Sequence, residues 1–259
     1  MTDQSPSIER NTIDRFTDRV ENYIRYRPLY PEKVVELFQN LFGAGRQTII
    51  ADIGCGPGHS SIGFLKAGLE VIGVEPNDVM RRAATEFCKD YTRFTVVAGT
   101  AENTGLNDHS VDIVLAAQAF HWFDRQRTRS EFERILRKNG WIVLMWNERQ
   151  LDTTPFLREY EMALKEFGTD YEAVRHDKLG AAELEDFFGG RPETVVFPNV
   201  QRLDLEGFLG RAFSSSYVPS QQSEMGKELE SKLRKLFDNY QQEGRIEIFY
   251  DTKVFYKQY

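Results

Sequence analysis

The sequence contains only two cysteines, Cys55 and Cys88, and four histidines among its 259 residues. So few cysteines exclude a disulfide framework and favour a reducing compartment, and we therefore expect a cytoplasmic protein. None of these residues has the spacing of a zinc site, so we expect no metal. No apolar run approaches the roughly 18 residues that a membrane helix needs. The polar N-terminus also lacks the apolar segment of a secretory signal.

The sequence has no excess of basic residues either. It has 33 Lys and Arg against 40 Asp and Glu, a net charge of −7. Because phosphate binding needs clustered Lys and Arg, this balance counts against a nucleic-acid partner. The one basic cluster, 125–138, fits the solvated face of a helix. The aromatic share of 13% excludes a disordered chain, and the length suffices for one large domain with a sizeable core.

Short apolar runs alternate with helical patterns through the first half of the chain. Strands apolar on both faces that alternate with helices indicate a mostly parallel α/β sheet covered by helices on both sides. We expect helices from Ser60, from Asn77 or Asp78, and near 126–137, and strands over 48–53, 70–75, 94–98, 111–117 and 141–146.

After Asn147 the pattern changes. Residues 155–188 are acidic and helical, and 194–200 form a strand that Pro198 restricts to an edge or an end. We further expect a helical segment over 204–212, an amphipathic helix over 224–242, and a strand or hairpin over 246–257. These patterns divide the chain into an N-terminal helical lid (1–47), a cofactor-binding core (48–150), an inserted helical cap (151–192) and a C-terminal completion of the sheet (193–259).

A glycine cluster follows the first expected strand directly: Asp52 precedes Gly54, Gly56 and Gly58. Glycine lets a ligand approach the backbone at the carboxyl end of a strand, and the following helix adds oriented amides. Glu75 lies 21 residues after Gly54, at the end of the second strand, where a carboxylate binds ribose hydroxyls. A tight turn with a capping acid is the plain structural alternative. The conjunction of strand, loop, helix, strand and acid favours a nucleoside site.

The spacing of the glycines distinguishes between nucleosides. A dinucleotide fingerprint needs its third glycine at position 59, where this chain has His59. The observed acid-x-G-x-G-x-G pattern resembles motif I of the class I S-adenosylmethionine-dependent methyltransferases. The resemblance covers roughly 48–147 and implies a Rossmann-like, doubly wound, seven-stranded sheet with an antiparallel C-terminal edge.

The same resemblance implies S-adenosylmethionine as cofactor, with the glycine loop around its methionine part, Glu75 on its ribose and 100–102 at its adenine edge. Arg27 is the candidate for its carboxylate. Met80 is expected over the adenine face, with core packing as the alternative. The expected cofactor-binding residues are Asp52, Gly54, Gly56, Gly58, Glu75, Pro76, Met80, Thr100, Ala101, Glu102, Ala117, Gln118, Tyr26 and Arg27.

Two segments, 118–124 (QAFHWFD) and 26–31 (YRPLYP), are similar to a small-molecule branch of that family, the methyltransferase type 11 or trans-aconitate methyltransferase-like proteins. His121 follows the fourth expected strand and titrates near neutral pH, so it is the candidate general base; a pocket-shaping histidine is the alternative. The candidate acceptor contacts are Trp122, Trp146 and Arg149, with core packing and a surface arginine as their alternatives.

Three functions remain open on the sequence. The first is methyl transfer to a small organic acceptor, with oxygen slightly favoured. The second is a non-catalytic S-adenosylmethionine-binding module, which only turnover distinguishes from the first. The third is a nicotinamide-dependent oxidoreductase, against which the missing third glycine counts. We expect no nucleic-acid or membrane partner, and a monomer or homodimer.

Overall fold

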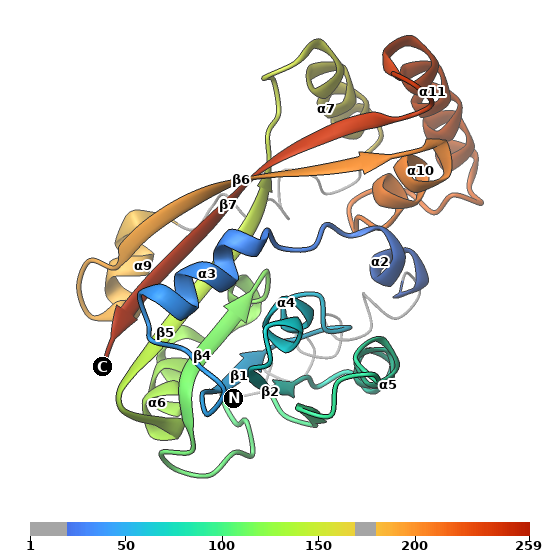
Figure 1. Cartoon of the computed structure of the whole chain (residues 1–259). Coiled ribbons are helices and arrows are strands. Elements are labelled where there is room, and N and C mark those ends of the chain that lie inside the picture. The colour runs from blue at the N-terminus through green and yellow to red at the C-terminus, as the bar shows by residue number, and fades with distance from the viewer. Residues whose placement is uncertain (1–19, 169–179) are drawn as a thin grey trace, which may run out of the picture.

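A single seven-stranded sheet runs through the molecule (Figure 1). The computed structural model describes residues 20–168 and 180–259, so parts of the expected lid (1–19) and of the expected cap (169–179) lie outside the described residues. The strand order is β3-β2-β1-β4-β5-β7-β6. All neighbours from β3 to β5 pair in parallel, whereas β7 is antiparallel to both β5 and β6. The expected doubly wound α/β fold is therefore confirmed.

The strands lie close to the positions that the apolar runs predict. Pro198 lies in β6, which is an edge strand, as its missing N–H requires. The seven strands are β1 (Ile49–Ile53), β2 (Glu70–Val74), β3 (Phe94–Val97), β4 (Val111–Ala117), β5 (Leu136–Arg149), β6 (Glu193–Leu203) and β7 (Ile246–Gln258).

Side-chain caps begin several of the helices. Asn77, Asp124 and Asp204 each accept a hydrogen bond from a backbone N–H of the first turn that follows. The helices are α2 (Val20–Tyr26), α3 (Glu32–Asn40), α4 (Ser61–Lys66), α5 (Asp78–Phe87), the 3₁₀ turn η2 (Phe120–Trp122), α6 (Arg125–Ile135), α7 (Pro155–Phe167), α9 (Ala181–Phe188), α10 (Leu205–Phe213) and α11 (Glu224–Tyr240).

The expected strand at 141–146 is longer in the structure, because β5 begins at Leu136. Asn139 and Gly140 lie at an irregularity within that strand, where the register against β4 shifts between Val111 and Ile113. Asn139 has a φ of 63°, a left-handed conformation that asparagine tolerates better than most residues. The chain therefore absorbs the extra residues as a bulge without ending the strand.

Three hydrophobic clusters pack against this sheet. One lies between the sheet and α3 and α4, and a second lies between the sheet and α6 and α9. The third contains residues of α7, α10 and α11 together with Ile246, Ile248 and Tyr250 of β7. Figure 1 shows these three helices gathered at the far end of the long β6–β7 pair, away from β1 and β2.

The two described helices of 151–192 thus belong to different clusters: α7 packs with α10 and α11, and α9 packs with α6. The division of the chain into lid, core, cap and completion stays a prediction. In the described parts of the chain, no helix is both long and apolar enough to cross a bilayer.

Candidate functional site

The glycine loop after β1 adopts a backbone that most side chains avoid. Gly54, Gly56 and Gly58 have φ values of 69°, 53° and 91°. A Cβ on Gly54 would lie 2.7 Å from the Cβ of Ala119, and one on Gly58 would lie 2.9 Å from Sγ of Cys88. A Cβ on Gly56 would meet nothing within 4 Å. Two glycines therefore serve packing, whereas Gly56 borders open space that a ligand can occupy.

Asp52 fastens this loop to the helix that follows it. The residue is fully buried, and its Oδ2 accepts hydrogen bonds of 2.6 Å from the hydroxyls of both Ser60 and Ser61. Burial raises its pKa to about 6, and the two serine hydrogen bonds oppose that shift. Its Oδ1 has no partner among the described residues. Asp52 thus holds the start of α4, and its predicted contact with the cofactor stays a prediction.

Glu75 at the end of β2 connects the loop to the next helix. Its Oε2 accepts a 3.0 Å hydrogen bond from the backbone N–H of Gly56, and its Oε1 accepts a 2.9 Å bond from that of Asn77. Burial raises the pKa of this carboxyl. The carboxylate therefore lies beside the open side of Gly56, where it fits both the hydroxyls of a ribose and the positive charge of a sulfonium.

The residues predicted to lie near the adenine differ in exposure. Met80 on α5 is buried, as is Ala101, whereas Pro76 is exposed. Thr100 pairs with Asn103 in a short bridge after β3. Glu102 accepts hydrogen bonds from the backbone of Asp124 at 2.9 Å and from the Thr128 hydroxyl at 3.4 Å. The Glu102 carboxylate therefore fixes the start of α6.

At the end of β4, Ala117 is buried and Gln118 has a φ of 56°. Its Nε2 donates to the carbonyl oxygen of Asn147 at 3.0 Å, while its Oε1 has no partner in the described parts of the chain. Asn147 itself donates to the carbonyl oxygen of Leu29 at 3.3 Å and accepts from the Thr252 hydroxyl at 2.6 Å. Asn147 of β5 thus links the N-terminal segment and β7 through its side chain and the end of β4 through its backbone carbonyl.

His121 and Trp122 lie in η2, next to this network. Both side chains are partly buried, and their ring centroids are 4.6 Å apart. Trp146 on β5 is buried between Phe120 and Phe255, with edge-to-face centroid distances of 6.3 and 5.8 Å. Its indole N–H has no acceptor among the described residues.

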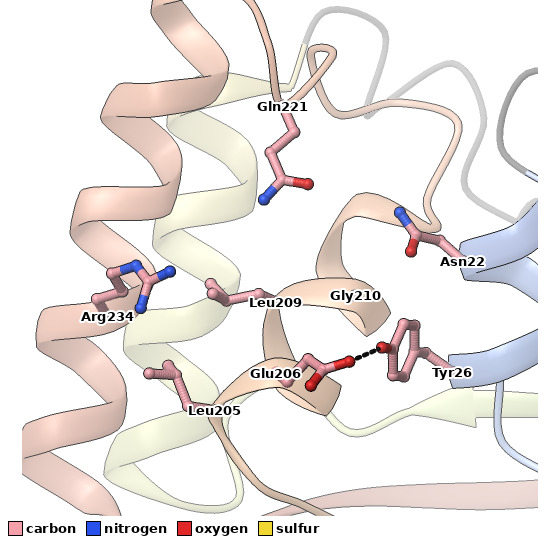
Figure 2. Close-up of a pocket in the computed structure, with 8 residues that line it drawn as sticks. All are labelled: Asn22, Tyr26, Leu205, Glu206, Leu209, Gly210, Gln221 and Arg234. Atoms are coloured by element: carbon pink, nitrogen blue, oxygen red, sulfur yellow. Dashed lines mark hydrogen bonds between the residues drawn. The ribbon is translucent and has the colours of Figure 1, made fainter.

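The two predicted N-terminal residues point in different directions. Tyr26 donates a 2.8 Å hydrogen bond to Glu206 and lines a pocket of about 460 Å³ between α2, α10 and α11, which Figure 2 shows. None of the glycine-loop residues lines that pocket. Arg27 instead donates to the carbonyl oxygen of Ser214 at 3.0 Å, and its guanidinium lies 4.9 Å from the ring of Tyr23.

Tyr23 and His59 connect this segment to the glycine loop. Their rings stack with centroids 5.9 Å apart, and Nε2 of His59 lies 2.8 Å from the carbonyl oxygen of Ile24. Burial lowers the pKa of His59 to about 4, so the ring is neutral at physiological pH. His59 therefore holds the N-terminal segment against the start of α4.

Arg149 at the end of β5 lies in a buried ion pair. Its Nη2 is 2.5 Å from Oε2 of Glu161 on α7, and both side chains are less than a tenth exposed. The guanidinium also lies 4.9 Å from the ring centroid of Tyr160. The surface alternative for Arg149 is therefore wrong, because α7 covers this side chain.

Sequence reasoning missed two residues that the fold brings to the same region, Arg211 and Tyr250. Arg211 is 6% exposed, and its Nε donates to the hydroxyl of Tyr250 at 3.1 Å. A single arginine within the otherwise apolar run 207–213 is the signal that was available. Tyr250 lies opposite Arg149 in the register of β5 and β7, which no local pattern predicts.

The comparisons with known proteins agree with this geometry. The profile of a family described as a methyltransferase domain matches residues 51–144, the segment that carries β1 to β5 and the glycine loop. An uncharacterized methyltransferase-like protein of Schizosaccharomyces pombe is 29% identical over 252 residues, which cover 95% of this chain and 96% of that protein. An uncharacterized methyltransferase of Mycobacterium tuberculosis is 37% identical over 138 residues, 52% of each chain.

The fold comparison extends beyond the core. A solved structure from Anaeromyxobacter dehalogenans, provisionally assigned as a type II methyltransferase, superposes with a TM-score of 0.66 at 20% identity. The superposition covers 90% of this chain and 98% of that one, so the shared fold extends well beyond residues 51–144. The matched domain, the full-length relative, the shared fold and the glycine loop beside Glu75 support a class I S-adenosylmethionine-dependent methyltransferase, a family whose cofactor is S-adenosylmethionine.

Proposed function

We propose that the protein transfers the methyl group of S-adenosylmethionine to a small organic acceptor, with oxygen as the favoured receiving atom. The observation that carries the proposal is the carboxylate of Glu75 on the amide of Gly56, next to the only loop glycine whose Cβ position opens into free space. Such a junction of backbone and carboxylate at the carboxyl ends of two parallel strands suits an adenosine ribose.

The charge of the molecule supports a small acceptor. The net charge is −7, and the arginines of α6 are largely engaged with acidic neighbours: Arg129 with Glu133, and Arg134 with Asp108 and Glu131. A surface of this kind offers little to a polyanionic nucleic acid. The low cysteine content supports a cytoplasmic setting.

S-adenosylmethionine supplies a methyl group that is already activated on a positively charged sulfur. The residues of this chain need to align the acceptor and exclude water. The bond from the methyl carbon to sulfur breaks as a bond to the acceptor oxygen forms, and S-adenosylhomocysteine leaves. A hydroxyl acceptor also loses a proton, for which we propose His121 as the receiving base. A carboxylate acceptor is already ionised and needs no base.

We also propose that the N-terminal segment closes over the cofactor. Asn147 and His59 both hold that segment through backbone carbonyl oxygens, at Leu29 and Ile24 respectively. Asn199 and Gln201 of β6 also donate to the segment, at the carbonyl oxygens of Leu29 and Tyr26. Closure of this segment excludes water from the transfer.

Calorimetry on the purified protein tests the proposal. We expect S-adenosylmethionine and S-adenosylhomocysteine to bind, and NAD not to bind appreciably. Replacing Glu75 by alanine is expected to weaken both ligands by about 1–3 kcal/mol, because their polar partners lose an acceptor.

Glu86→Ala is the matched control, since Glu86 lies on the neighbouring α5 with a side chain that is 74% exposed. Equal affinities in Glu75→Ala and the control would remove Glu75 from the site. Tight NAD binding without S-adenosylmethionine binding would reject the proposed function. Binding of S-adenosylmethionine with no transfer to any acceptor would favour a binding module.

A further inference from the structure

Two arginines of the described structure, the buried Arg211 and the partly buried Arg27, have no carboxylate partner among the described residues. Arg211 is 6% exposed and donates only to neutral oxygens, the hydroxyl of Tyr250 at 3.1 Å and that of Ser215 at 3.2 Å. Arg27 donates to the carbonyl oxygen of Ser214, and its Nε is buried without a partner. Among the described residues, no Asp or Glu forms an ion pair with either guanidinium, although most other arginines have one.

The two guanidiniums are also close to each other. Ser214 and Ser215, the neighbours that they contact, directly follow α10. Arg211 lowers the pKa of Arg27, in addition to the larger effect of burial. Two like charges in a poorly solvated region destabilise each other unless an anion compensates them. Glu161 pairs with Arg149 nearby, whereas no Asp or Glu of the described residues pairs with Arg27 or Arg211.

The tyrosine rings around Arg211 suit the carbon skeleton of an organic acid. Its guanidinium lies 5.9 Å from the ring centroid of Tyr250, and the phenol of Tyr250 donates to Oε1 of Gln201 at 3.1 Å. Because this phenol accepts from Arg211 and donates to Gln201, the Arg211 fork is held in one orientation. The rings of Tyr160 and Tyr250 offer apolar faces for a carbon skeleton.

The position of this group relative to the glycine loop is set by the strands. Tyr250 and Thr252 are two residues apart in β7 and so lie on the same face of the sheet. Tyr250 pairs with Arg149 of β5, and Thr252 pairs with Asn147. Two residues along a strand span about 7 Å. Arg211, which donates to Tyr250, therefore lies next to the Asn147–Gln118 hydrogen bond at the end of β4, about two residues farther along the strand pair. Arg27, by contrast, packs on Tyr23, which stacks on His59 at the start of α4.

We propose that Arg211, held by Tyr250 and Ser215, binds the carboxylate of an anionic methyl acceptor, while Arg27 faces the carboxylate of S-adenosylmethionine. The proposal rests on the proposed function and names its acceptor class: a small organic acid. A guanidinium fork binds a carboxylate through two parallel hydrogen bonds. Nε and Nη1 of Arg211 are engaged by protein hydroxyls, and Nη2 donates no hydrogen bond within the described chain.

The first test compares acids with their neutral analogues on the wild-type protein. Benzoate, phenylacetate, succinate and glutarate, each beside its amide, are titrated calorimetrically with and without S-adenosylhomocysteine. We expect at least one acid to bind roughly 10-fold or more tightly than its amide, because only the acid carries the charge. Equal binding of acids and amides, or no binding of any acid, would overturn the inference. Tighter binding of methyl phosphate than of every acid would also overturn it.

The second test separates the two arginines. Arg211→Gln is expected to weaken the acid by roughly 10- to 100-fold and to leave the affinity for S-adenosylhomocysteine within about threefold. Arg27→Gln is expected to weaken S-adenosylhomocysteine by a similar factor. The opposite pattern would reject the assignment.

Because Arg211 is buried, Arg211→Lys and Tyr250→Phe serve as milder variants. The lysine keeps the charge but loses the fork, and the phenylalanine removes the hydroxyl that orients it, so both are expected to show smaller losses of acid affinity. Unchanged acid affinity in both folded variants would contradict the proposal. Absence of S-adenosylhomocysteine binding in the wild type would reject the proposed function itself, and the acid–amide comparison without that ligand would still decide the anion site.

Discussion

The buried charges of this protein are separated by sign along the sheet. At the glycine loop, Asp52 and Glu75 are buried carboxylates that accept hydrogen bonds from serine hydroxyls and backbone amides. At the β6–β7 end, the guanidiniums of Arg149 and Arg211 lie against tyrosine rings, and within the described residues only Arg149 of these two pairs with a carboxylate. One end therefore suits a cationic sulfonium donor, and the other suits an anion. Complementary fields of this kind orient two reactants toward each other before any bond changes.

His121 in η2 is the proposed base, and its replacement is expected to have the largest effect. For a hydroxyl acceptor, His121→Ala should lower kcat roughly 10²–10⁴-fold with little change in cofactor affinity, because a base acts on the acceptor side. For a carboxylate acceptor, the same change should mainly raise KM. Steady-state kinetics of S-adenosylhomocysteine formation distinguishes the two outcomes.

His109→Asn is the control for that experiment. His109 lies before β4 with a φ of 49° that asparagine tolerates, and its Nδ1 contacts the carbonyl oxygen of Leu136. Wild-type kcat and KM in both variants would leave His121 as a packing residue only.

The next largest effect, on the free energy of unfolding, is expected at Arg149, which forms an ion pair with Glu161. Arg149→Met leaves Glu161 buried without its main counter-ion, and removing one member of a buried pair costs about 3–5 kcal/mol. Lys165, whose Nζ is 3.3 Å from Glu161, offsets part of this loss, so we expect about 3 kcal/mol. Urea unfolding measures the difference in free energy. Arg202→Ala, which removes an exposed pair with Glu247, should cost less than about 1 kcal/mol; equal losses would show that burial does not matter here.

At the acidic end the effect depends on pH. The pKa of Asp52 is raised to about 6 in the folded state, above the unfolded value of about 3.9. The folded protein therefore binds more protons between these values, and its stability falls as the pH rises through about 6. Asp52→Asn lacks this titration, so its stability relative to the wild type should increase by about 2 kcal/mol from pH 4 to pH 7.

Urea unfolding of both proteins at pH 4.5, 6 and 7.5 checks this slope. Any constant offset from the new amide does not depend on pH and drops out of the comparison. Parallel curves for the two proteins would show that Asp52 ionises normally despite its burial.

The smallest expected effect concerns the segment that links the two ends. Amides of 20–31 should exchange roughly 10-fold more slowly when S-adenosylmethionine is bound, because closure over the cofactor adds protection to the segment. Hydrogen exchange followed by mass spectrometry measures this, with α11 as an internal reference. Identical protection of 20–31 with and without cofactor would identify the segment as a fixed part of the core.

The glycine loop and the β6–β7 end also differ in how far the sequence predicts them. The runs 48–53 and 70–75 are local patterns, and Glu75 follows from its distance to Gly54, so the sheet and the loop edge were predicted close to their observed positions. Arg211 and Tyr250 are 39 residues apart and meet only because β7 inserts between β5 and β6. Contacts of this kind depend on tertiary register, which periodicity does not encode.

Asp52 shows a different limit of sequence reasoning. Its position before the glycines matches a ligand-binding motif, yet its side chain is turned inward to Ser60 and Ser61. The sequence shows that an acid is required there, while the direction in which its carboxylate points depends on two hydroxyls that the motif does not include.

The place of β7 in the sheet also governs the order in which the protein is built. On a ribosome, β1 to β5 emerge first and can pair in parallel from local crossovers. β6 has no neighbour except β7, so residues 193–203 remain unpaired until 246–258 have been made. Until then β5 presents a long open edge, the kind of surface on which nascent chains aggregate. Chaperone dependence during synthesis should therefore concentrate in the interval between 149 and 246.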